Sequence, residues 1–104
     1  MSSSICIKLE NETKNTNGGW KSSDSITNWA YPGDADEFEN TLDDCDFLDC
    51  TTADAESVTY EGNTDNAYRK LIEALTNTKY ANLLPAPPAD AHWDDAELTL
   101  TLYY

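Results

Sequence analysis

The sequence predicts an α+β fold: a small, mostly antiparallel sheet packed by one main helix, with a second, short acidic helix beside it. Three observations lead to this prediction. Four short segments alternate apolar and polar residues, which is the pattern of strands with one buried face. One later segment repeats apolar residues at helical spacing, and an acidic block separates its apolar from its acidic residues when it is drawn as a helix. At 104 residues the chain fits a single domain, 1–104.

The strand prediction depends on alternation within each of the four segments. In the first of them, Cys6 alternates with Ile5 and Ile7 and therefore faces the side of the sheet opposite to theirs. In the last of them, three leucines alternate with two threonines, which is the strongest strand signal in the chain. Turn-forming residues end the middle two segments. The predicted strands are residues 4–9, 26–31, 57–61 and 96–104.

The main helix is predicted to begin near Asp65, where Thr64 or Asp65 can cap its N-terminus. Its apolar stripe would cover the buried face of the sheet. Three prolines between residues 85 and 88 forbid further helix, so we expect the helix to end between Asn77 and Leu83. The stripe consists of Ala67, Leu71, Ile72 and Leu75.

The acidic block at residues 34–49 is predicted to form the second helix. Asp34 is placed as its N-cap, and the early acids suit the positive end of the helix dipole. The later acids lie at the wrong end of that dipole, and like charges three and four residues apart repel, so stability alone does not explain the pattern. Phe47 falls among the acids instead of the apolar residues. The predicted inward stripe is Phe38, Leu42, Cys45 and Leu48, and the opposite side carries Asp36, Glu39, Asp43 and Asp46, flanked by Glu37 and Asp44.

The negative charge of the chain is regional. The formal net charge is -14, and the interval between Lys21 and Arg69 holds 13 Asp and Glu but no Lys or Arg. A balance this negative disfavours direct binding to nucleic acid or to a membrane. Charge that gathers in one region favours a surface that binds a basic partner. The predicted partner-binding residues are Asp34, Asp36, Glu37, Glu39, Asp43, Asp44, Asp46 and Asp49.

The sequence carries no recognisable catalytic or metal-binding pattern, and we expect neither an enzyme nor a cofactor. Three cysteines without a CxxC pair do not make a zinc site, and they fit reduced thiols in a cytoplasmic protein. Neither Asp34 nor Asp44 starts an EF-hand loop in register, which leaves only weak divalent-cation binding by clustered acids. The single histidine, His92, has no recognisable catalytic partner.

These features lead to a functional expectation: a non-catalytic inhibitor whose carboxylates imitate DNA phosphates and block the basic nucleic-acid-binding site of a host defence or DNA-processing protein. In length, charge and lack of a catalytic set, the chain resembles phage and mobile-element inhibitors of restriction enzymes, CRISPR effectors or DNA repair enzymes. A phage-encoded protein of this kind would act in the cytoplasm of the host cell.

Two alternatives to this expectation stay open. An immunity or antitoxin protein that neutralises a basic nuclease relies on the same steered association of an acidic patch with a cationic site. A structural partner-binding protein is the other alternative. A homodimer is also a candidate, because the last strand, which ends in Tyr103 and Tyr104, can pair with a second copy if it forms a sheet edge.

Overall fold

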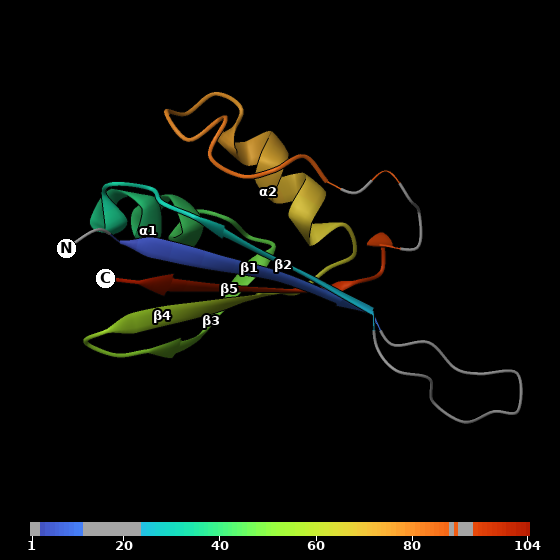
Figure 1. Ribbon diagram of the computed structural model, residues 1–104, viewed down its shortest axis with the longest axis horizontal. Coiled ribbons are helices and arrows are strands. Elements are labelled where there is room, and N and C mark those ends of the chain that lie inside the picture. Colours follow the sequence, from blue (N-terminus) through green and yellow to red (C-terminus); the bar gives the residue numbers. More distant parts are fainter. Residues whose placement is uncertain (1–2, 12–23, 88, 90–92) are drawn as a thin grey trace, which may run out of the picture.

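The computed structural model describes residues 3–11, 24–87, 89 and 93–104, and it shows two helices and a five-stranded sheet (Figure 1). All strand pairs are antiparallel, and the order across the sheet is β2-β1-β5-β4-β3. This confirms the predicted α+β class. The elements are β1 (Ser4–Asn11), β2 (Asp24–Ala30), α1 (Ala35–Asp43), β3 (Leu48–Ala53), β4 (Ser57–Gly62), α2 (Ala67–Leu75) and β5 (Glu97–Tyr103).

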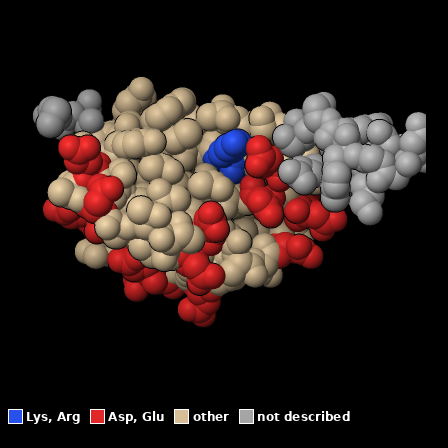
Figure 2. All heavy atoms as spheres, turned by 90° about the horizontal axis from the view of Figure 1, so that it is seen from below, with Lys and Arg blue, Asp and Glu red and all other residues tan. Residues whose placement is uncertain are grey.

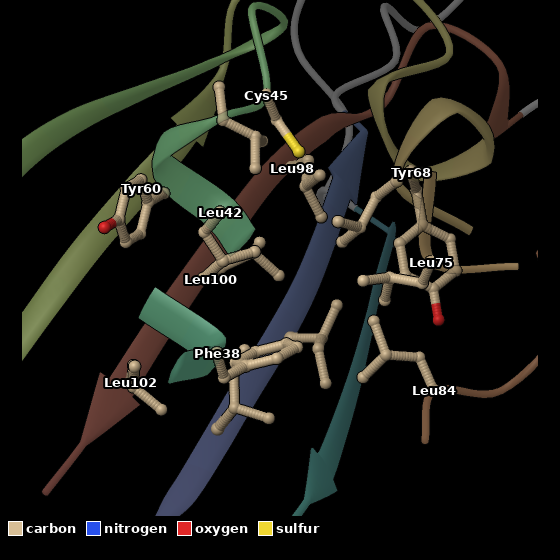
Figure 3. Packing of buried hydrophobic residues seen from close by; sticks show 14 of the residues in the cluster. Phe38, Leu42, Cys45, Tyr60, Tyr68, Leu75, Leu84, Leu98, Leu100 and Leu102 are labelled. Carbon is tan, nitrogen blue, oxygen red and sulfur yellow. The ribbon is translucent and has the colours of Figure 1, made fainter. Parts of the chain in front are cut away.

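One face of the sheet forms the core, and both helices pack against it. The central strand β5 buries its three leucines, and these point toward the apolar side chains of α1 and α2 (Figure 3). Leu102 lies between Ile5 of β1 and Val58 of β4, and Leu100 is paired with Tyr60 of β4 in the same way. Cys6 is only half-buried between two buried isoleucines, so its predicted orientation toward the opposite face is confirmed.

The acidic helix is shorter than the sequence predicts. Asp34 caps α1 as expected, but the helix ends at Asp43, with Asp44 as its C-cap. A turn follows, in which the Leu48 backbone N–H donates to the Cys45 carbonyl. The acids at the unfavourable end of the helix dipole explain the early end, since they repel one another and the terminal carbonyls. Asp46 therefore does not belong to the helical face to which we assigned it.

The strand β3 was not predicted. Leu48, assigned above to the helix stripe, instead begins β3, and it is the only residue of that strand that is buried. The next five residues are exposed, and the pairing with β4 shifts register between Cys50 and Thr52. Without alternation of buried and exposed residues, this strand has no periodic signal, because its stability comes from hydrogen bonds to β4.

Three further predictions need correction. Strand β5 lies in the middle of the sheet, so the segment ending in Tyr103 is not the edge through which we expected a second copy to pair. The N-cap of α2 is Asn66, in a left-handed conformation with φ 61°, and neither Thr64 nor Asp65. The helix ends at Leu75, before the predicted interval.

None of the helices in the described part of the chain combines the length and the apolar content that a membrane crossing needs.

Candidate functional site

The helix α1 holds the largest group of predicted partner-binding residues in a defined orientation. The Asp34 carboxylate accepts a hydrogen bond from the Glu37 backbone N–H at 3.1 Å, which satisfies one of the free donors of the first turn. Phe38 and Leu42 are fully buried, and the Phe38 ring meets the edge of Tyr80 at a centroid distance of 4.8 Å. The core side of α1 is therefore fixed, and its acids are held at its flanks and outer surface.

Two carboxylates of α1 are bound by tyrosine hydroxyl groups, one from β4 and one from the residue that follows β5. The Tyr60 hydroxyl donates to Asp43 Oδ1 at 2.6 Å, and the Tyr104 hydroxyl donates to Glu39 Oε1. The ring of Tyr60 is buried with the core, while its hydroxyl points away from the leucines of β5 (Figure 3). Tyr60 thus reaches from the apolar layer to the acidic flank of the helix, while Tyr104 approaches that flank from an exposed position.

The pKa values of these two tyrosines are raised by burial, by their hydrogen bonds and by the carboxylates near them. Burial, the hydrogen bond to Asp43 and the charge of Glu39 together hold the pKa of Tyr60 far above its ordinary value. Burial, the hydrogen bond to Glu39 and the charges of Asp36 and Asp43 raise the pKa of Tyr104 to about 12. Both hydroxyls therefore remain donors at neutral pH. We call Asp36, Glu39 and Asp43 the α1 acidic cluster.

Glu37 does not belong to this cluster. It lies at the other flank of α1, where its carboxylate pairs with the Lys79 ammonium at 2.6 Å. The hydrogen bond to Glu37 raises the pKa of Lys79, so the ammonium group keeps its charge at neutral pH. Because its charge is matched by a lysine, Glu37 contributes less to the negative field than its neighbours do.

The remaining predicted residues lie beyond the cluster along the chain. Asp49, in β3, accepts a hydrogen bond from the Asn63 side-chain amide at 3.1 Å, and the same amide donates to the Asp46 carbonyl at 3.0 Å. The side chains of Asp44 and Asp46 are exposed in the turn between α1 and β3. Asn63 therefore ties this turn and the start of β3 to the end of β4.

The hairpin between β3 and β4 carries an acid that the sequence analysis missed. One carboxylate oxygen of Asp54 accepts from the backbone N–H groups of Glu56 and Ser57, at 2.8 and 2.9 Å. These two hydrogen bonds lower the pKa of Asp54. Asp54 could have been identified from its position three residues before Ser57 in a tight hairpin, where an aspartate often accepts hydrogen bonds from the backbone.

A common feature connects these carboxylates: neutral groups hold them. The donors are tyrosine hydroxyls for Glu39 and Asp43, a side-chain amide for Asp49 and backbone N–H groups for Asp34 and Asp54. A neutral donor orients a carboxylate without cancelling its charge, in contrast to the lysine that pairs with Glu37. One face of the molecule shows acidic groups at several places around neutral surface, and basic groups at one place only (Figure 2).

The tyrosine and asparagine donors could not be identified from the sequence. Tyr60 and Asp43 are 17 residues apart, and Tyr104 and Glu39 are 65 residues apart. The contacts depend on the strand order and on the position of α1 against β3 and β5, which local patterns do not contain.

Cys45 is a buried, packed thiol. Burial, followed by the charges of Asp44 and Asp46, raises the pKa of Cys45, whose thiol donates to the Thr41 carbonyl at 3.4 Å. A raised pKa makes a poor nucleophile. Within residues 3–11, 24–87, 89 and 93–104, no group of three or more His, Cys, Asp or Glu side chains is arranged to hold a metal ion. His92 lies outside the described residues.

The fold and this surface define a small α+β protein with preoriented, largely unneutralised carboxylates. No family model matches the chain, and no curated protein or solved structure matches it either.

Proposed function

We propose that this protein is a non-catalytic inhibitor that uses its carboxylates as substitutes for DNA phosphates and occupies the basic site of a nucleic-acid-binding protein. The observation that carries this proposal is the support of Glu39 and Asp43 by tyrosine hydroxyls, which orient the two charges and leave them uncompensated. A merely soluble acidic protein has no need for ordered carboxylates. A surface that replaces a fixed row of phosphates gains from preorganisation, because less freedom is lost on binding.

The spacing of the α1 acidic cluster supports the same proposal. Asp36, Glu39 and Asp43 follow one another at intervals of three and four residues along α1. Side chains at such intervals lie about 5–6 Å apart on a helix surface. Phosphates along one DNA strand advance about 3.4 Å per nucleotide along the axis while they wind around it, so the two charge rows have similar density. The cluster offers charge but no base edge, which suits competition for a cationic channel and not sequence reading.

The target belongs to the class of basic nucleic-acid-binding proteins: a restriction, CRISPR or repair enzyme, or a toxin nuclease that the protein neutralises. These targets share the same recognition chemistry, and an acidic surface accelerates association with each of them. The source of the captured target distinguishes the two classes of inhibitor. A host enzyme as target indicates an inhibitor of defence or repair, and a toxin nuclease as target indicates an immunity protein.

The proposal is tested by capture and competition. A lysate is passed over the immobilised protein, bound proteins are eluted with duplex DNA, and the dissociation constant of the purified pair is measured with and without excess DNA. A cluster variant carries Asp36→Asn, Glu39→Gln and Asp43→Asn. We expect its dissociation constant to exceed that of the wild type by at least about tenfold at low salt, because three oriented charges are lost.

A control variant with the same loss of charge comes from the opposite end of β5. Asp65, Asp95 and Glu97 are exposed and surround a shallow hollow there. Their replacement by Asn, Asn and Gln should leave the dissociation constant within about threefold of the wild-type value, as expected for exposed charges away from the contact. Equal losses in both variants, or binding that saturating DNA does not weaken, would show that α1 is not a phosphate surrogate.

A further inference from the structure

The two edges of the sheet differ in their protection against pairing with another strand. An edge strand presents unpaired N–H and C=O groups, and proteins usually protect such edges with charges, prolines or bulges. The β3 edge has a register shift between Cys50 and Thr52, and it carries Asp49. The β2 edge pairs with β1 in continuous register over its whole length, and its one charged residue is Asp24 at the start of the strand, since residues 25–33 contain no charged side chain. By these criteria β2 is the open edge.

Exposed apolar side chains gather along the same edge. Trp29 is 55% exposed, and Tyr31, which follows β2, is 67% exposed. On the face of the sheet that the helices do not cover, the Trp29 ring stacks on Tyr103 with a centroid distance of 5.9 Å. Exposed aromatic side chains grouped at one place are typical of a contact surface.

The helix-covered side of β2 has an apolar hollow at this edge. Its volume is about 200 Å³, and Ile26, which is only half-buried, lies in its wall. The core of the sheet is thus incompletely covered at β2, while the same strand supplies an apolar side chain that is not fully buried. The lining consists of Ile7, Leu9, Ile26, Asn28, Tyr68, Pro85 and Ala86.

The distribution of charge selects a second copy of this chain as the occupant. A surface that contacts itself brings every charge against the same charge, so in a chain of net charge -14 only an uncharged surface is suitable. Most of the β2 edge meets this condition, because its one charged residue, Asp24, stands at the first position of the strand and residues 25–33 carry no charge. By contrast, α1 contacts β5 and β3 and carries its acidic cluster away from β2.

We propose that two copies pair antiparallel through their β2 strands, about a two-fold axis perpendicular to the sheet, and form one continuous ten-stranded sheet. In this arrangement each β2 satisfies the free backbone groups of the other. Ile26 of each copy lies on the helix-covered face, next to the hollow of the other copy. The α1 acidic clusters lie over the β5-to-β3 side of each copy, away from the joined β2 strands, which reduces their mutual repulsion.

The test is the molar mass in solution, measured by light scattering or sedimentation equilibrium from micromolar to millimolar protein. The wild type should approach twice the chain mass of 11.6 kDa as its concentration rises. Thr27→Lys places a charge on the β2 edge, and we expect it to raise the dimer dissociation constant by at least about tenfold, because each dimer gains two like charges close together.

Thr52→Lys is the matched control, since Thr52 is an exposed threonine on the other edge strand and the net charge changes equally. It should leave the dimer constant unchanged, and circular dichroism verifies that both variants fold. A wild type that remains monomeric at millimolar concentration overturns the proposal. This result is expected if β2 pairs only with a strand of another protein. A dimer that Thr27→Lys does not weaken, or that Thr52→Lys weakens as much, overturns it as well.

Discussion

At the level of single residues, the informative feature is the contact between a protonated tyrosine and a charged carboxylate at the border of the core. Tyr60 contributes its ring to the buried layer and its hydroxyl to Asp43, and Tyr104 donates to Glu39 from the end of the chain. Such a contact links packing to surface charge, because the core fixes where the hydroxyl lies and the hydroxyl fixes where the carboxylate lies. The position of the Asp43 carboxylate is therefore tied to the packing of the core through the buried ring of Tyr60.

Replacing Tyr60 by phenylalanine tests this link. The change keeps the ring but removes the donor to Asp43, and we expect the free energy of unfolding to fall by about 1–2 kcal/mol, as for a hydrogen bond to a charged group. Urea denaturation followed by circular dichroism measures the effect. Asp43→Asn is the control, since its amide oxygen still accepts from Tyr60 and it should cost less. If the two variants are equally unstable, the hydroxyl is not the stabilising group.

The raised pKa values predict a loss of stability in alkali. A group whose pKa is higher in the folded than in the unfolded protein stabilises the fold fully below the unfolded pKa. This contribution is lost as pH rises toward the folded value. For Tyr60 and Tyr104 the ordinary value is 10.0, so the loss should begin near pH 10. Denaturation midpoints from pH 8 to pH 11 measure it, and Tyr60→Phe should make the decline above pH 10 shallower. An equal decline in that variant would assign it to other groups.

At the level of elements, the junction between β4 and α2 depends on the absence of a side chain at Gly62. A Cβ atom at this position would lie 2.6 Å from Cβ of Ala67, the first residue of α2, and 3.3 Å from Cβ of Leu98 in β5. Gly62 also pairs with Leu48 at the start of β3. Residues of α2, β5 and β3 thus meet at Gly62 in β4. Glycine is needed at this position because there is no room for a Cβ atom, and not because the backbone conformation is unusual.

Gly62→Ala should therefore destabilise the protein although alanine favours ordered structure. We expect a loss of about 1–3 kcal/mol, the usual cost of overpacking, measured by thermal or urea denaturation. Ala67→Gly in the same chain removes the nearer obstacle and should restore part of the loss. If the double variant is less stable than the sum of the two single changes predicts, the obstacle is not Ala67.

At the level of the whole molecule, negative charge exceeds positive charge by a wide margin and is only partly paired. Among the described residues, ion pairs join Lys8 to Glu10, Arg69 to Asp94 and Lys79 to Glu37, all of them at exposed positions. Exposed pairs of this kind stabilise a fold very little. The net charge of -14 therefore destabilises the folded protein through repulsion among its negative charges.

Salt should therefore stabilise the isolated protein and weaken its complex with the proposed basic target. Screening over about 8–10 Å at ordinary ionic strength reduces the repulsion between exposed carboxylates. A gain of about 1 kcal/mol from added sodium chloride corresponds to a rise in Tm of about 4–8 °C for a domain of this size. The variant with Asp36→Asn, Glu39→Gln and Asp43→Asn should show a smaller rise. A Tm that does not change with salt would contradict net repulsion in the folded state.

Features that depend on the local order of residues could be predicted from the sequence. Alternation identified four strands and the buried sides of β1 and β5, and the N-cap at Asp34 located the start of α1. The regional charge was also evident, because composition is independent of conformation. The exposed strand β3 was missed, and α1 was extended too far, because a solvated strand has no periodicity and the repulsion of its acids ends the helix early.

Contacts between residues far apart in the chain became known from the folded arrangement of the elements. It placed the last strand in the centre of the sheet, left β2 at an open edge and brought Tyr60 and Tyr104 under the acids of α1. Periodicity in the sequence indicates on which face of a strand or helix a residue lies. It does not indicate which residue of another element lies beside it on that face. The neighbour is set by strand order and register, and these are chosen by the burial of the whole core at once.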